Sequence, residues 1–471
     1  MTDVPDFRST TVEALAASVR SGERSARSLT DAALDRIEAA NVELNAFVAI
    51  DAEAAQRQAD AIDERLAAGQ DVGPLAGIPI GVKDLADAAG FRTTRGAAHL
   101  ADSAPVTHDA TEVARLRAAG CVVIGKTNTP EAGFVGDTYN PTFGPTRNPW
   151  NTERSPGGSS GGTSAAIASG LVPLATGSDG GGSIRIPSTV CGLSGFKPSQ
   201  GRIPHGPAPM GAADLSTVGP MARRIRDVAL ALDVVVGPSA DDLRSLPHPG
   251  ASFRAVCDAP QAPRRLLYCA STDGTSTVDD EIAARTAEAV DTIRAAGVEV
   301  VEVDGVLPDA FSPFLLLFFG GMVPAYRHLM GTDAFDAVTP DLQRILLMAD
   351  ERLTPDSIEE ARKAAQTNSV MLAEAMIGFD ALITPTVIGH TPVSQRGGVI
   401  NGNEELGWVG NTFAFNVTRR PAGTTPIGLT ADGMPLGLQI VGHQLDDLRT
   451  VELTAWAEDV FGLDLVAPFP A

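Results

Sequence analysis

The chain has 471 residues, of which 44% are hydrophobic and 20% are charged, so its composition is globular and excludes a disordered, collagen-like or coiled-coil chain. Its 36 Lys and Arg residues are outnumbered by 58 Asp and Glu residues, which gives a net charge of −22. This charge would repel phosphate backbones and anionic membrane surfaces, so the sequence disfavours nucleic acid, membranes and anionic substrates as partners.

The chain begins with a helical layer, which we expect over about residues 8–70. Two patterns, Thr10-x-x-Glu13 and Ser28-x-x-Asp31, have the form of capping boxes, and apolar residues follow each of them at helical spacing. The N-terminus lacks the basic segment and apolar run of a signal peptide, which predicts a cytoplasmic protein.

After Pro74, short apolar runs alternate with helical patterns. Such alternation favours an α/β fold, and no linker or repeat marks a boundary. We therefore expect a single large domain over residues 1–471, with a central mixed, twisted β-sheet covered by helices on both sides. The predicted strands are 78–82, 121–124, 266–269, 298–303, 381–384, 424–429 and 436–441, and the predicted helices include 110–119, 279–296 and 446–460.

Two further features concern cysteines and membranes. The longest uncharged stretch, residues 310–326, is shorter than the roughly 20 apolar residues that span a bilayer, so we expect a helix that lines a core or a pocket. The cysteines show no paired spacing, and we expect them to be free thiols. They are Cys121, Cys191, Cys257 and Cys269.

Three segments place polar residues among glycines or at the end of an apolar strand. They are Lys83, which follows the predicted strand 78–82, the run GGSSGG at 157–162, and the run GGGSIR at 180–185. Alone, such a lysine is usually a surface residue and such serines are usually in turns. In this order, with Ser159 and Ser183 separated by 183 − 159 = 24 positions, they form a specific pattern.

This pattern closely resembles the amidase signature family of serine hydrolases. The resemblance covers a core of about residues 74–228 and extends more weakly to residues 415–442. It implies that Ser183 is the nucleophile, that Ser159 is a bridging serine held by a cis peptide, and that Lys83 is the base. It implies no cofactor and no metal.

The residue types suit this chemistry. A serine hydroxyl is a weak nucleophile at neutral pH and needs a nearby base. Lysine can be that base only when neutral, and its reference pKa of about 10.4 must therefore be lowered, which burial would achieve. A hydroxyl both donates and accepts, so Ser159 can pass a proton between Ser183 and Lys83.

The glycines before Ser183 offer backbone N–H groups that no side chain shields. We expect an oxyanion hole formed by Gly180, Gly181, Gly182 and Ser183. For the flanking charged residues, Asp179 and Arg185, we expect a structural pairing role rather than direct catalysis.

Other chemistries fit less well. The run Gly158-x-Ser160-x-Gly162 satisfies the nucleophile elbow of α/β-hydrolases, which would make Ser160 the nucleophile, but a loop rather than a strand precedes it. The seven histidines show no paired spacing, which disfavours a metal site, and the glycine-rich stretch contains no nucleotide-binding motif.

Several residues are candidates for shaping the substrate pocket. The resemblance implies that Gly133 and Phe134 lie beside the scissile group. Arg202 and His205 follow the core in a loop that either reaches the mouth of the site or is simply exposed. The apolar residues Phe314 to Phe319, with Met322, form either a core helix or an acyl pocket. Arg419 and Arg420 would help to lower the pKa of Lys83 if they pointed inward.

The sequence thus favours a serine amidohydrolase that cleaves neutral carboxylic amides, and the same machinery would attack anilides, esters and carbamates. Within the family, the chain most resembles bacterial enzymes for aminoalkanoate oligomers and urethanes. An alternative is the amidase subunit of a tRNA-dependent amidotransferase, which would need a partner protein. A third possibility, a silent binding protein, conflicts with the intact Lys83, Ser159 and Ser183. We expect a small-molecule amide or carbamate substrate, no nucleic acid or membrane partner, and a monomer or homodimer.

Overall fold

A computed structural model of the chain describes residues 5–207 and 215–469, so that residues 208–214 of the predicted core lie outside the described residues. Its first sheet contains the predicted strand that ends in the lysine. This strand, β2, is buried along its whole length and runs parallel to both of its neighbours. The strand order is β1 (Phe47–Ile50), β3 (Val122–Thr127), β2 (Pro79–Lys83), β4 (Leu174–Asp179) and β6 (Thr217–Ala222).

Parallel β2 and β4 place their last residues, Lys83 and Asp179, at the same edge of this sheet. Strands β1 and β6 pair antiparallel at the two sides, so the sheet is mixed. The near-continuous apolar character of β2 and β3 is typical of strands that are covered on both faces. Burial on both faces therefore brings the lysine side chain into the interior.

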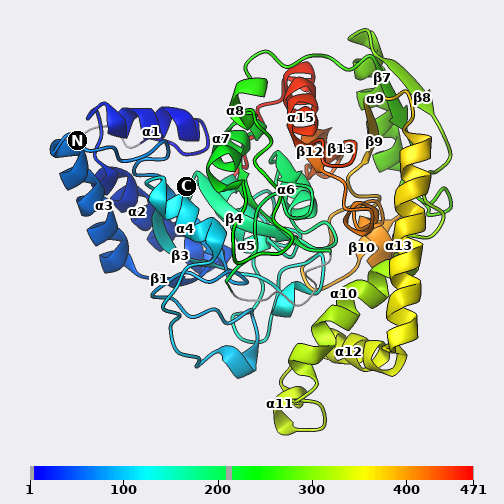
Figure 1. Cartoon of the computed structure of the whole chain (residues 1–471), viewed down its shortest axis with the longest axis horizontal. Coiled ribbons are helices and arrows are strands. Elements are labelled where there is room, and N and C mark those ends of the chain that lie inside the picture. Colours follow the sequence, from blue (N-terminus) through cyan, green and yellow to red (C-terminus); the bar gives the residue numbers. More distant parts are fainter. Residues whose placement is uncertain (1–4, 208–214, 470–471) are drawn as a thin grey trace.

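Helices cover the first sheet, and Figure 1 shows α1 to α3 gathered at the N-terminal end of the molecule. The predicted helical layer is present, but its first caps differ from the predicted ones. Thr11 caps α1 by accepting from the Ala14 N–H, and Ser25 caps α2 by accepting from the Ser28 N–H. The helices are α1 (Val12–Arg20), α2 (Ala26–Leu44), α3 (Ala52–Ala67), α4 (Thr111–Ala118), α5 (Gly161–Ala168), α6 (Arg185–Val190), α7 (Ile225–Val235) and α8 (Phe253–Val256).

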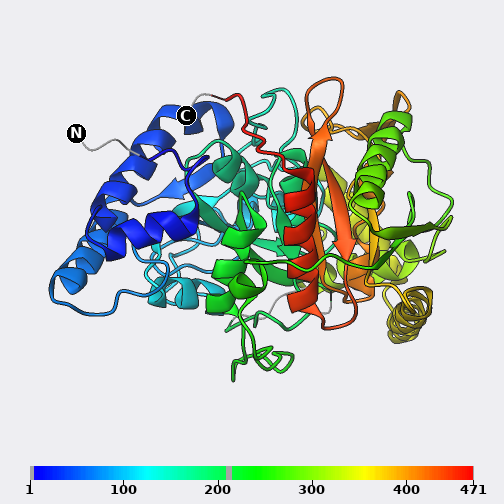
Figure 2. The ribbon, with the colours of Figure 1, turned by 90° about the horizontal axis from the view of Figure 1, so that it is seen from above.

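The α/β class is confirmed, and the strands divide between two large sheets rather than one. In the second sheet, β7 runs parallel to β8 and β9, and the other pairs are antiparallel. The last helix lies along β12 and β13, as Figure 2 shows. The order is β5 (Gly195–Lys197), β12 (Ala422–Leu429), β13 (Pro435–Val441), β9 (Ala381–Pro385), β7 (Arg265–Tyr268) and β8 (Glu299–Glu302), with α9 (Asp280–Ala295) and α15 (Asp447–Phe461).

The uncharged stretch at 310–326 forms α10 (Phe311–Tyr326), which begins a helical segment at the side opposite α1 to α3 (Figure 1). Its aromatic residues Phe314, Phe318 and Phe319 pack with Phe134 in a hydrophobic cluster that is separate from the main core. Among the helices of residues 5–207 and 215–469, none is both long and apolar enough to cross a membrane. The remaining elements are α11 (Asp333–Asp336), α12 (Pro340–Arg352), α13 (Pro355–Ala375), α14 (Ala414–Val417) and the hairpin β10 (Gly398–Ile400) and β11 (Asn403–Glu405).

The four cysteines are buried and free, as predicted. The predicted strands and helices recur within a few residues of their expected bounds, for example α15 at Asp447–Phe461 and β13 at Pro435–Val441. Their burial explains this agreement, because long apolar segments with clear periodicity have few alternative structures. Together these elements form a single α/β domain.

Candidate active site

Lys83 ends β2 inside the protein, where it is only 1% exposed. Its Nζ lies 2.8 Å from the Oγ atoms of both Ser159 and Ser160, and 2.9 Å from Ser178 Oγ. No carboxylate lies within ion-pair distance of Nζ in the described part of the chain. The amine is therefore held by three hydroxyl groups, which stabilise an ammonium far less than a carboxylate would.

Burial lowers the pKa of the Lys83 amine from 10.5 to about 7, and the negative charge of Asp179 opposes this shift only in part. A second buried lysine, Lys197 on β5, also has its pKa lowered by burial to about 7. Its Nζ donates to the Pro198 carbonyl oxygen at 3.0 Å and does not touch a serine. A lowered pKa alone does not identify a base, whereas contact with a pocket serine singles out Lys83.

Ser159 lies in the loop between the first sheet and α5, and its peptide bond to Gly158 is cis, as the resemblance implies. The glycines around it are required by space. A Cβ on Gly158 would lie 2.6 Å from the backbone nitrogen of Asp137, and a Cβ on Gly133 would lie 3.0 Å from Ser159 Oγ. Only glycine at these positions lets the chain approach Ser159 so closely.

Ser183 follows β4 in the turn that leads into α6, and it is 7% exposed. Asp179 and Arg185 form the predicted pair, with Arg185 Nε and Nη2 each 2.9 Å from a carboxylate oxygen of Asp179. Burial alone would raise the pKa of the Asp179 carboxyl, but the Arg185 guanidinium holds it below its usual range. The ion pair thus spans and fixes the turn that carries Ser183.

One predicted member of the oxyanion hole is already engaged. The Gly182 N–H donates to Asp179 Oδ1 at 2.8 Å, so it is not available to a substrate oxygen. The N–H groups of Gly180, Gly181 and Ser183 make no hydrogen bond to another described residue. These three backbone donors remain as candidates.

The C-terminal segment closes over the ion pair from the other side. Asn416 Nδ2 donates to the Asp179 carboxylate at 2.9 Å, and Thr412 Oγ1 donates to the Gly181 carbonyl oxygen at 2.6 Å. Arg185 Nη2 donates to Asn416 Oδ1 at 2.7 Å. The weak resemblance at residues 415–442 thus corresponds to a segment that supports the Ser183 turn.

A pocket of about 480 Å³ opens onto the two serines. The residues that line it include Ser159, Ser183, Gly180 and Gly133. Its wall includes Leu85, Phe318, Met322 and Tyr326, so α10 contributes to both a core and the pocket. Sequence reasoning missed several polar residues that line the pocket, because their positions follow no spacing rule; they include Asp87, Arg95, His99, Ser178 and His328.

Two predicted substrate-binding residues lie elsewhere. The prediction that Arg202 binds substrate is wrong. Its Nε donates to Asp447 Oδ2 at 2.9 Å, and this ion pair joins the loop to the start of α15 rather than to the pocket. Phe134 is buried against Tyr139 and the aromatic cluster, beside Gly133 but not on the pocket wall.

The remaining candidates from the loops also miss the pocket. Arg419 is exposed and Arg420 is buried, and neither lines the pocket, so they do not adjust the pKa of Lys83 by contact. His205 borders a smaller cavity of about 50 Å³, which Lys83, Ser178 and Glu112 also line. Burial lowers the pKa of His205.

Ser160 is buried at the start of α5 and does not line the pocket. No strand precedes it, since residues 155–160 are irregular, so the nucleophile-elbow interpretation fails on geometry as well. Its hydroxyl instead helps to hold Lys83 Nζ.

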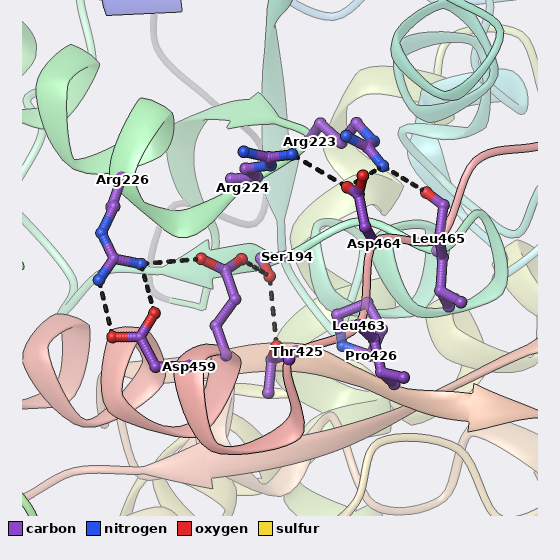
Figure 3. Close-up of a pocket in the computed structure, with 13 residues that line it drawn as sticks. Ser194, Arg223, Arg224, Arg226, Thr425, Pro426, Asp459, Leu463, Asp464 and Leu465 are labelled. Carbon is purple, nitrogen blue, oxygen red and sulfur yellow. Dashed lines mark hydrogen bonds and ion pairs between the residues drawn. The ribbon is translucent and has the colours of Figure 1, made fainter. Parts of the chain in front are cut away.

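A second pocket, of about 310 Å³, lies beside the end of α15 (Figure 3). Its three arginines all face carboxylates: Arg223 and Arg224 pair with Asp464, and Arg226 pairs with Asp459. These pairs fasten the C-terminal segment and leave no free cation among the described residues that line this pocket. Within residues 5–207 and 215–469, no group of three or more His, Cys, Asp or Glu side chains is placed to hold a metal ion.

Known proteins match this chain along nearly its whole length. The amidase family model matches residues 28–451. An acylamidase of Rhodococcus erythropolis is 34% identical over 455 residues, which cover 95% of this chain and 94% of the relative. A glutamyl-tRNA(Gln) amidotransferase subunit of Roseiflexus castenholzii is 34% identical over 461 residues, which cover 90% of each.

Solved structures also match this chain along nearly its whole length. A bacterial aryl acylamidase of the amidase signature enzymes superposes with a TM-score of 0.89 at 28% identity, covering 96% of each chain. A 6-aminohexanoate cyclic dimer hydrolase in complex with substrate superposes with a TM-score of 0.88 at 30% identity, covering 99% of this chain and 100% of that chain.

Proposed function

This chain belongs to the amidase signature family of hydrolases, and we propose that it cleaves the C–N bond of neutral carboxylic amides through an acyl-enzyme on Ser183. The observation that carries the proposal is the contact of Lys83 Nζ with Ser159 Oγ at 2.8 Å, beside a pocket that Ser159 and Ser183 share. A lysine with a pKa of about 7 is neutral in about half of the molecules at neutral pH, and the neutral amine can accept a proton.

In the proposed reaction, Ser183 Oγ attacks the carbonyl carbon while its proton passes to Ser159, whose own proton passes to Lys83 Nζ. The tetrahedral intermediate collapses when the C–N bond breaks, and the proton returns from Lys83 through Ser159 to the leaving nitrogen. Water then attacks the acyl-enzyme while its proton passes through Ser159 to Lys83. The acid leaves when the bond between Ser183 Oγ and the acyl carbon breaks, and the proton returns to Ser183 Oγ. Every proton is returned, so no cofactor is consumed.

We propose that the N–H groups of Gly180, Gly181 and Ser183 provide the oxyanion hole. The Asp179–Arg185 pair would hold their orientation, because it spans the same turn. Fixed donors of this kind contribute about 10²–10³ in rate elsewhere. Residues 74–228 would then form the catalytic core.

The same machinery would attack anilides, esters and carbamates, and the aromatic wall from α10 suits an aryl or alkyl group. We propose a cytoplasmic enzyme that acts alone on a small-molecule amide or carbamate, as a monomer or homodimer. The amidotransferase subunits among the relatives favour one alternative, an amidase subunit that needs a partner protein. The purified chain distinguishes the two: turnover of a p-nitroanilide without a partner supports the stand-alone enzyme, and no turnover until a partner is added supports the alternative.

Labelling by a fluorophosphonate, located by mass spectrometry, tests the nucleophile. We expect the adduct on Ser183 and none in Ser183→Ala, whereas Ser103→Ala, which removes another serine from the pocket wall, should label normally. An adduct on Ser160, or full activity in Ser183→Ala, would reject the mechanism.

A further inference from the structure

Arg95 is fastened to both sides of the active site by its backbone. Its N–H donates to the Asp84 carbonyl oxygen at 3.0 Å, directly after Lys83, and its carbonyl oxygen accepts from the Ala132 N–H at 2.8 Å, directly before Gly133. The residue has a positive φ of 54°. Arg95 lines the pocket that contains Ser159 and Ser183, and it also lines the smaller cavity beside Lys83 and Glu112. The backbone thus fixes this arginine at the border of the catalytic pocket.

This guanidinium has no partner among the described residues, either as an ion pair or as a hydrogen bond. The nearby carboxylates are engaged elsewhere. Asp84 pairs with Lys126 at 2.9 Å and accepts from Thr94, and Asp87 lies 3.3 Å from His108 Nε2. Although the protein has 58 acidic side chains, none of those described pairs with this arginine.

The contrast with the pocket in Figure 3 supports this interpretation. There, Arg223, Arg224 and Arg226 also line a pocket, but each pairs with a carboxylate between 2.6 and 2.9 Å away. Those arginines have a structural role that is complete within the protein. Arg95 has five N–H donors, and because no described residue accepts from its side chain these donors are available to a ligand.

Basic side chains outnumber acidic ones among the described residues that line the pocket. His99 and His328 also line this pocket, and the pKa of His99 is lowered first by burial and then by the charges of His328 and Arg95. These three basic groups therefore lie close to one another. Among the described residues that line this pocket, Asp87 is the one acidic residue.

We propose that Arg95 binds a carboxylate carried by the substrate, so that the preferred substrates are amides with a carboxylate remote from the scissile bond. The planar guanidinium can hold both carboxylate oxygens at once. The inference rests on the proposed amidase activity and narrows its substrates. The net charge of −22 predicts that the molecule as a whole repels anionic substrates. An anion-binding Arg95 would make the pocket an exception to that prediction.

Two pairs of anilides test the proposal and show which side of the bond carries the carboxylate. N-phenylsuccinamate against butyranilide places the charge on the acyl side, and 4-acetamidobenzoate against acetanilide places it on the amine side. Each substrate is assayed with the wild-type enzyme and with Arg95→Met, so that intrinsic reactivity cancels in the ratio. Arg57→Met, which removes an exposed arginine from α3, controls for the change in net charge.

For at least one charged anilide, we expect Arg95→Met to lower kcat/KM by about 10- to 100-fold, the usual value of a hydrogen-bonded charge. Both neutral anilides should change by less than about threefold, and added salt should lower the wild-type preference. Arg57→Met should leave all four values unchanged. Equal losses on charged and neutral substrates, or no loss, would overturn the proposal.

A binding measurement separates this inference from the proposed function. Calorimetric titration with succinate and with benzoate needs no turnover, and at least one of them should bind the wild-type chain about tenfold more tightly than Arg95→Met. If no anilide is hydrolysed but this difference is present, the proposed hydrolysis fails and the anion site stands. If the anilides are hydrolysed but neither anion distinguishes the two proteins, the anion site is rejected.

Discussion

Glu112 provides a stability test that is independent of activity. It lies in the first turn of α4, is 2% exposed, and neither of its carboxyl oxygens has a hydrogen-bond partner among the described residues. Burial raises the pKa of its carboxyl from 4.5 to about 8. The side chain is therefore protonated at neutral pH in the folded protein and ionised in the unfolded chain.

The sign of the effect follows from this difference. Because the pKa is raised on folding, the unfolded state releases a proton that the folded state retains, and stability falls as the pH rises from 4.5 towards 8. One such proton costs about 1.4 kcal/mol per pH unit, so the loss between about pH 5 and pH 8 is on the order of 3 kcal/mol. Glu112→Gln has nearly the shape of the protonated acid but cannot ionise. It should match the wild type near pH 5 and exceed it by about 3 kcal/mol near pH 8.

Urea unfolding at several pH values, followed by the fluorescence of the three tryptophans, measures this difference. Glu43→Gln, which removes an exposed glutamate from α2, is the matched control and should track the wild type at every pH. A free-energy gap between Glu112→Gln and the wild type that stays constant with pH would refute the reasoning. It would mean that Glu112 ionises equally in the folded and unfolded states.

Three further predictions concern the active site and two buried ion pairs. The kcat/KM of the wild type should rise as the pH passes about 7, because only neutral Lys83 accepts a proton, and an activity maximum below pH 6 would contradict this role. Asp179→Asn should leave the Arg185 charge buried without a partner, destabilise the protein by about 3–5 kcal/mol in urea unfolding, and lower activity through the turn it holds. Arg202→Met should lower stability by a similar amount, because it leaves Asp447 buried without its partner. In the folded enzyme it should change KM by less than about twofold, since this ion pair lies outside the pocket. A large rise in KM would instead identify Arg202 as a substrate-binding residue.

The residues whose roles depend on local backbone or on fixed spacing could be predicted from the sequence. Lys83 ends an apolar run, and such a run predicts a buried strand. The last side chain of that strand, Lys83, is therefore buried as well. The glycines at 157–162 and 180–182 indicate close backbone approach, and the structure places backbone or side-chain atoms where their Cβ atoms would lie. The α/β class follows in the same way from alternating patterns.

Other features were decided only when segments far apart in the chain met. Nothing in the sequence indicates that the Gly182 N–H is taken by Asp179, that Arg202 pairs with Asp447 some 245 positions away, or that Arg95 is left without a carboxylate among the described residues. Charged side chains in loops can choose among many partners, and the choice depends on which elements pack together. Sequence alone therefore determined which residues could do the chemistry, and the tertiary structure decided which of them face the substrate, because burial and pairing are properties of the assembled fold.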